Sequence, residues 1–318
     1  MSVTARLPTV DGRDPGRPGV RPCCILTARL PLIGDNLFDP ATSRLVHRYG
    51  TGIWGYVTRR EHSGIVYSPA MGFIDIGHVR DLADLTLHYY LRLCQGHARG
   101  DAFPPFFYRG RIEILKPIPA EHLLAVARSL AYDQSVFHEI YTYWQPWLSG
   151  HHSAFSPEDL VSNLLGTHVG ERAIVAGGDF NRAVTDALGG LLTGLGALPR
   201  AGTAAALEAI TGRWIEGRFS ELTYVRRRNF GIRPIEPWLV PGLDGGGATA
   251  PPADLSPELP PGTREYYLAT YAVPRTARRG MQVDTVRHTD FDADGPLIAR
   301  IRADASRPVM YGPTFDAP

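Results

Sequence analysis

The chain has 318 residues, of which 44% are hydrophobic and 20% are charged, proportions typical of a globular protein with a hydrophobic core. Lys and Arg number 33 and Asp and Glu 32, a formal net charge of +1, so the overall charge gives no attraction for nucleic acid or an anionic membrane. The three cysteines, Cys23, Cys24 and Cys94, are too few for a disulfide framework and complete no zinc-binding set.

The first 22 residues are rich in Pro, Gly and Arg and are expected to form a disordered tail. They lack the apolar core of a signal peptide, and no apolar run approaches the roughly 18 residues that span a bilayer. We therefore expect a cytoplasmic protein with no membrane span and no nucleic-acid partner. The sequence leaves the oligomeric state open.

Short apolar patterns flanked by turn residues predict strands in the first third of the chain and near its end. The expected strands cover 52–57, 63–68, 106–115, 264–273 and 283–291. The first two would form a hairpin, and all would join one small antiparallel sheet. Residues 233–262 are rich in Pro and Gly and are expected to form a linker or loop.

Helical periodicity predicts the remaining elements, at about 75–94, 120–146, 180–198 and 201–217, with a further helix that starts at Ser156. Ser156, Pro157 and the acids Glu158 and Asp159 form a strong helix start with the spacing of a capping box. The predicted fold is therefore α+β, a helix-rich single domain with a small antiparallel sheet. Its main domain would cover 23–232, with the 263–318 segment packed on it.

Polar residues interrupt the apolar stripe of the 75–94 helix. Asp75 falls within this stripe and His78 lies on its edge, three residues away, so their side chains can meet. Asp81, Asp84 and His88 fall on the opposite side, which indicates a solvated face. Buried ionisable groups are unfavourable unless they are partnered, so Asp75 and His78 are candidate site residues.

The next helix repeats this pattern. Gln134 lies in the middle of its apolar stripe, His138 lies near the edge, and Glu139 lies off it. The adjacent His and Glu are similar to the start of an HExxH zinc motif, but Thr142 stands where the second His is required. Metal ligands from separate helices are therefore the arrangement left open.

The third helix offers polar groups at a spacing of four: Asn163, Thr167 and Glu171. We expect polar groups from three helices to meet in one pocket, with Gln134, Asn163, Thr167 and Glu171 lining it. In a metal-assisted hydrolase, His78 and His138 would bind Zn, Mn or Fe. Asp75 would bind the metal or orient His78, and Glu139 would be the general base on a bound water.

Two ligands of one ion must lie within about 4.5 Å of each other, which sets the structural requirement for His78 and His138. The substrate would be a small molecule or a peptide. One alternative is a metal-free Cys/His acyl transferase or hydrolase that uses Cys94. Another is a binding or structural module in which the buried polar network only fixes helix packing.

Several sequence blocks resemble an uncharacterised bacterial family, domain of unknown function 4056. The blocks are GIVYSPAMGFIDIGHVRDLADLT (64–86), SVFHEIYTYW (135–144) and SAFSPEDLVSNLLGT (153–167), with PCC at 22–24 and LGALPR at 195–200. The resemblance covers roughly 22–230 and implies one extended domain. It places these residues in its motif blocks: Asp75, His78, Arg80, Asp81, His138, Glu139, Ser156 and Asn163. It implies no activity.

Overall fold

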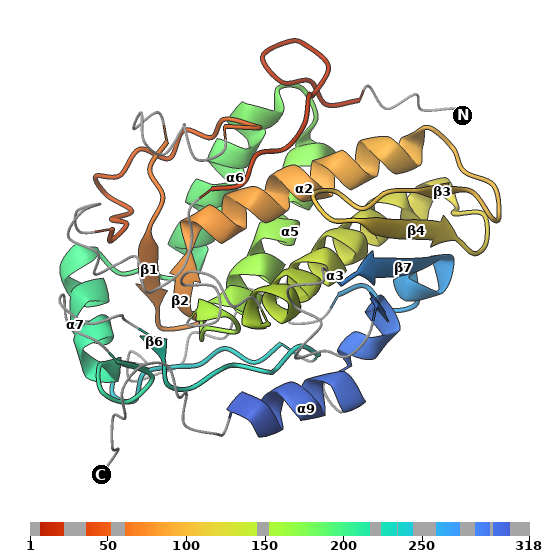
Figure 1. Ribbon diagram of the computed structural model, residues 1–318. Helices are drawn as coiled ribbons and strands as arrows, with labels where there is room; N and C mark the ends of the chain where they lie inside the picture. Colours follow the sequence, from red (N-terminus) through yellow and green to blue (C-terminus); the bar gives the residue numbers. More distant parts are fainter. Residues whose placement is uncertain are drawn as a thin grey trace.

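A computed structural model describes residues 7–21, 36–51, 61–144, 153–216, 224–233, 235–243, 259–273, 284–292 and 295–305. Three long helices, α2, α3 and α5, pack against one another, and a small sheet lies beside α3 at one end of them (Figure 1). The chain is therefore α+β and helix-rich, as predicted. Among the described residues, no helix combines the length and the apolar character that crossing a membrane requires.

The helices begin close to the predicted positions, but α6 and α7 end four and seven residues earlier than predicted. Their bounds are α2 Ile76–Cys94, α3 Leu123–Tyr143, α5 Asp159–Ala176, α6 Phe180–Gly194, α7 Arg200–Ile210 and α9 Pro296–Ala305, with short 3-10 turns η2 Ala120–His122, η3 Thr263–Tyr266 and η4 His288–Phe291. Helix α9 was not predicted, because its region follows segments with strand patterns. The predicted hairpin strand 52–57 lies outside the described residues.

Helix α5 begins two residues later than the capping pattern predicts. Residues 156–158 form a turn, which the Asp159 N–H closes by donating to the Ser156 carbonyl at 3.1 Å. The Asp159 carboxylate accepts from the Ser156 backbone N–H at 2.7 Å, which is the acidic half of a capping box. Phe155, just before this turn, has a left-handed φ of 58°, which redirects the chain into the helix.

The main sheet is antiparallel, with strand order β3-β4-β7-β8. Its strands are β3 Ala102–Phe103, β4 Gly110–Ile114, β7 Tyr267–Ala272 and β8 Thr285–Arg287. The register pairs Ile112 with Ala269 at the centre, so a C-terminal strand lies inside the sheet rather than at its edge. Phe137 of α3 stacks on Tyr271 of β7 with ring centroids 4.4 Å apart, which packs the sheet onto the helices.

The strand predicted at 63–68 forms a separate hairpin. Strands β1 (Ile65–Ser68) and β2 (Gly72–Asp75) pair antiparallel, with Val66 opposite Ile74. Both strands are fully buried, which fits their continuous apolar character. The prediction that this strand joins the main sheet is wrong, because β2 runs directly into α2 and holds the hairpin at the start of that helix. Strands β5 (Ile215–Glu216) and β6 (Tyr224–Val225) form a third small sheet.

Helices α2 and α5 pack closely because α5 presents glycines to α2. A Cβ atom on Gly166 would lie 2.6 Å from the Val79 carbonyl oxygen, and one on Gly170 would lie 3.0 Å from Ala83 backbone atoms. Only glycine lets the two backbones approach this closely. The contact matters for the site, since Val79 adjoins His78.

Residues 7–21 pack on the helical body, which the prediction of a disordered tail did not anticipate. The Asp11 backbone N–H donates to the Asp179 carboxylate at 2.6 Å. The guanidinium of Arg21 is buried and forms ion pairs with Glu61 at 2.7 Å, Asp81 at 2.9 Å and Asp84 at 3.1 Å. A buried arginine with three carboxylate partners anchors this segment.

The same contacts correct the prediction of a solvated face on α2. Asp84 is fully buried and the Asp81 side chain is only 15% exposed. His47 lies on the same side, with Nε2 2.7 Å from Asp84 and Nδ1 3.2 Å from the Arg80 guanidinium. Helical periodicity places these polar residues on one face of the helix. It cannot show that a distant segment supplies their ion-pair and hydrogen-bond partners.

Candidate functional site

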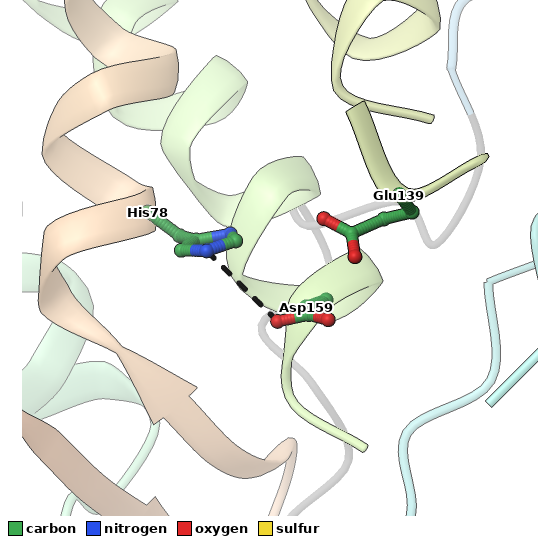
Figure 2. Close-up of side chains that lie close together, drawn as sticks. All are labelled: His78, Glu139 and Asp159. Carbon is green, nitrogen blue, oxygen red and sulfur yellow. Dashed lines mark ion pairs between the residues drawn. The ribbon is translucent and has the colours of Figure 1, made fainter. Parts of the chain in front are cut away.

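Three buried side chains from three helices form a cluster that we call the acidic His cluster: His78, Glu139 and Asp159. One ligand atom from each lies within 4.8 Å of the other two. His78 is in the first turn of α2, Glu139 is near the end of α3, and Asp159 begins α5. Figure 2 shows the three side chains directed toward one another from their separate helices.

The His78 ring is oriented by a residue one turn along α5. The Nδ1 of His78 lies 2.8 Å from the Oδ1 of Asn163, and its Nε2 lies 3.9 Å from the Oδ1 of Asp159. An amide oxygen only accepts hydrogen bonds, so Nδ1 carries the proton in this contact. The Nε2 then presents its lone pair toward the two carboxyls, as a metal-binding imidazole does.

Consecutive backbone N–H groups hold the two carboxyls. The Phe155 N–H donates to Glu139 Oε2 at 2.9 Å, and the Ser156 N–H donates to Asp159 Oδ2 at 2.7 Å. Phe155 reaches this position with its left-handed backbone, a conformation that costs a non-glycine residue roughly 1–2 kcal/mol. Strain of this kind concentrates at functional sites, where the surrounding structure maintains it.

The electrostatics of the cluster are unfavourable without a cation or a shared proton. Burial raises the pKa of Glu139, while the nearby His78 opposes the shift. Burial, followed by the charge of Glu139, raises the pKa of Asp159 well above its usual range. One oxygen of each carboxyl lies within 4.8 Å of the other. Two adjacent buried carboxyls cannot both ionise readily unless a positive charge compensates them.

A cavity of about 880 Å³ reaches this cluster. Its polar lining includes His78, Glu139 and Asn163, together with Gln134, Ser135 and His138. Its apolar lining includes Leu82 and Leu85 of α2, Phe106, Phe107 and Tyr108 of the loop before β4, and Tyr141 of α3. Small-molecule sites combine a few convergent polar groups with apolar walls in this way.

His138 lines this cavity but is not a member of the cluster. Its Nδ1 is hydrogen-bonded to the Tyr108 hydroxyl. Burial, and then the charge of His78, lowers the pKa of His138 to about 4, so its imidazole is neutral at pH 7. The structure therefore joins His78 to Glu139 and Asp159, where the sequence analysis had paired His78 with His138.

Two further predicted site residues have structural partners. The Asp75 carboxylate accepts from the backbone N–H groups of Gly77 at 2.7 Å and His78 at 3.4 Å, so Asp75 is the N-cap of α2. It positions the turn that carries His78 and does not belong to the cluster. Gln134 lines the cavity, and its Oε1 accepts from the buried Tyr89 hydroxyl.

Of the three polar residues predicted on the third helix, the structure brings only Asn163 to the cluster. The Thr167 hydroxyl donates to the Leu164 carbonyl of its own helix at 2.8 Å. Glu171 forms an ion pair with Arg128 at 2.6 Å, about two turns beyond Asn163. The spacing of four places the three residues on one side of α5. Their partners differ because α5 contacts different residues at each turn: Asn163 meets His78, whereas Glu171 meets Arg128.

The sequence pattern around Asp159 predicts only a capping role for its carboxylate, so Asp159 was not among the predicted site residues. The structure shows that one carboxylate does both: Oδ2 accepts from Ser156, and Oδ1 faces His78. The sequence does contain an indication that Asp159 belongs to the site. Asp159 and Asn163 are four residues apart and therefore share a helix face.

Cys94, the nucleophile of the alternative hypothesis, lies at the far end of α2. Burial raises the pKa of its thiol, and the neighbouring Tyr90 opposes this shift. A raised pKa reduces the thiolate fraction on which nucleophilic cysteines depend. Cys94 is also not among the residues that line the cavity.

A family model described as Protein of unknown function (DUF4056) matches residues 15–234, more than half of the chain, and this range includes His78, Glu139, Asp159 and Asn163. No curated protein and no solved structure matches the chain. The chain therefore belongs to the family described as Protein of unknown function (DUF4056).

Proposed function

We propose that this protein is a metal-assisted hydrolase in which His78, Glu139 and Asp159 hold one divalent cation. The observation that supports this most directly is the convergence of three ligand atoms within 4.8 Å, all from buried side chains. Because the three residues come from three different helices, this convergence depends on the packing of the whole helical body.

The donor set suits a particular group of metals. One imidazole nitrogen and two carboxylate oxygens favour Zn, Mn or Fe over softer or harder ions. A divalent cation would also compensate the two carboxyls, whose pKa values burial raises. Asn163 would hold the His78 ring in the orientation that such a metal requires.

The expected chemistry is hydrolysis of a bond brought into the cavity. Three protein ligands leave positions for water and substrate, and a bound divalent cation would lower the pKa of that water and polarise a carbonyl group. His138 is neutral at pH 7 and lines the same cavity, so it can accept a proton from that water and then pass the same proton to the leaving group. Glu139 serves in this proposal as a ligand rather than as the general base.

Metal content and metal affinity test the proposal. Purified protein is supplemented with Zn, Mn or Fe, and bound metal is measured by inductively coupled plasma mass spectrometry and titration calorimetry. We expect one equivalent in the wild type and in His138→Gln, and a loss in His78→Ala, Glu139→Gln and Asp159→Asn. Asp186→Asn, on the exposed surface of α6, is the matched control. A wild type that takes up no stoichiometric metal contradicts the proposal.

The proximity of two buried carboxyls favours a second candidate, a metal-free acid–base pair. Glu139 and Asp159 have oxygens within 4.8 Å of each other, and a close pair of carboxyls can share one proton and divide the roles of acid and base. Hydrolysis that persists in the presence of a chelator, and that is lost in both Glu139→Gln and Asp159→Asn, would favour this candidate. If the cluster is only structural, the same variants should lower the melting temperature without altering any metal response.

A further inference from the structure

One wall of the cavity is built from aromatic rings. Phe106, Phe107 and Tyr108 are consecutive in the loop before β4, and Tyr141 lies on α3. Ring centroids are 5.5 Å apart for Phe106 and Phe107, and 5.6 Å apart for Tyr108 and Tyr141. These contacts make a continuous apolar surface on which a ligand ring or chain can lie.

Phe107 is the unusual member of this wall. It is 70% exposed, and its φ of 70° places a bulky residue in the left-handed region. Such a conformation is unfavourable for an aromatic residue, and the exposed ring gains little from burial. Neither feature stabilises the fold, whereas a ligand in the cavity would cover the ring.

The other apolar lining continues this surface. Leu82 and Leu85 face the cavity from α2, and Val20 faces it from the N-terminal segment. Val20 is itself 43% exposed, so two of the most exposed large hydrophobic residues of the described chain belong to this one cavity. Its volume of about 880 Å³ is in the upper part of the range for small-molecule sites.

We propose that the cavity binds an amphiphilic ester or amide of a carboxylic acid, with its apolar chain against Phe107 and its carbonyl group at the acidic His cluster. The position of the carbonyl rests on the proposed metal site, while the position of the chain rests on the aromatic wall alone. The polar end of the cavity and its apolar wall thus recognise the two halves of one molecule.

A series of straight-chain carboxylates, which mimic the acid product, tests this inference. Hexanoate, octanoate, decanoate and dodecanoate are titrated into the zinc-loaded full chain by calorimetry, below their micelle concentrations. Burial of each added methylene group should tighten Kd by about two- to fourfold. Affinity that does not change with chain length would overturn the inference.

Phe107→Asn removes the aromatic ring and introduces a residue that accepts a positive φ, so it tests the wall without straining the loop. We expect this variant to weaken dodecanoate binding by about tenfold or more, on the scale of a lost aromatic contact. Val175→Asn is the matched control, because Val175 is equally exposed, at 73%, and does not line the cavity. Equal dodecanoate affinity in Phe107→Asn and wild type would overturn the inference.

Metal-free Glu139→Gln protein separates this inference from the proposed function. If both are correct, this variant binds every carboxylate more weakly but keeps the same gain per methylene group. If carboxylate affinity rises with each methylene group but does not depend on metal, the result supports the apolar site and counts against the metal site. If carboxylate affinity depends on metal but does not rise with each methylene group, the result supports the metal site and overturns the apolar site.

Discussion

The Nδ1 of His78 and the Oδ1 of Asn163 are 2.8 Å apart, although the two residues are separated by 85 positions in the chain. The contact joins the first turn of α2 to the second turn of α5, next to the glycine contacts between these helices. Orientation of the His78 ring, and thus of the cluster, therefore depends on how closely α2 and α5 pack.

Asn163→Ala should weaken metal binding without removing a metal ligand. The His78 ring would lose the acceptor that fixes its orientation, and loss of such an outer partner typically lowers metal affinity 10–100-fold. Titration calorimetry with Zn²⁺ measures the effect, and thermal unfolding monitors the fold. Asn163→Asp retains an acceptor for the Nδ1 proton and should restore most of the affinity. Unchanged Zn²⁺ affinity in Asn163→Ala would show that this contact does not orient a ligand.

Gly166→Ala should destabilise the protein and impair the site together. The new methyl group would lie 2.6 Å from the Val79 carbonyl oxygen, which forces α5 away from α2, and overpacking of this kind typically costs about 1–3 kcal/mol. Urea denaturation measures the free energy of unfolding, and titration with Zn²⁺ measures the metal affinity of the site.

Gly190→Ala is the matched control for this substitution. Gly190 is also inside a helix, α6, but a methyl group there would meet no atom within 4 Å. We expect it to stabilise the protein by up to about 1 kcal/mol through helix propensity and to leave Zn²⁺ affinity unchanged. Equal effects of the two substitutions would contradict close packing of α2 and α5 at Gly166.

The contribution of Glu139 and Asp159 to the stability of the metal-free protein should fall as the pH rises from acid to neutral. Burial raises the pKa of Glu139 and Asp159 in the folded state, so the folded protein retains protons that the unfolded chain releases above its ordinary carboxyl pKa of about 4. The stabilising contribution is therefore present below about pH 4 and is lost as the pH rises through the raised values.

Urea denaturation in the presence of a chelator, repeated across this pH range, measures how the free energy of unfolding changes with pH. Glu139→Gln should flatten the profile, since an amide removes one of the two interacting charges, while the exposed Asp186→Asn should leave it unchanged. Saturating divalent cation should restore stability at neutral pH, because it binds only the folded cluster. A chelated wild type whose stability profile matches that of Glu139→Gln would show that the pair does not retain protons.

Local sequence patterns predicted the helices well because the determinants of these elements are local. The N-cap at Asp75 and the acidic half of the capping box at Asp159 both act within a few residues. The apolar stripes also identified His78, Gln134, His138 and Asn163 as polar groups in or beside them, and all four line the cavity, as does Glu139, which lies off the predicted stripe.

Sequence patterns failed where a distant segment supplies the partner. Asp81 and Asp84 resembled a solvated face until Arg21 was seen to pair with both. The 63–68 strand was assigned to the main sheet, although it pairs with residues 72–75. In each case the element forms where the local pattern predicts it, but long-range contacts determine which segment lies beside it.

The sequence by itself determined which faces of the helices are apolar and which polar residues interrupt them, because helical periodicity depends only on residue spacing. Only the tertiary structure decided that His78 meets Glu139 and Asp159 rather than His138. The physical reason is that a helix fixes the direction of its side chains, while the partners they meet depend on interhelical packing, which here includes the close approach of α5 to α2 at Gly166.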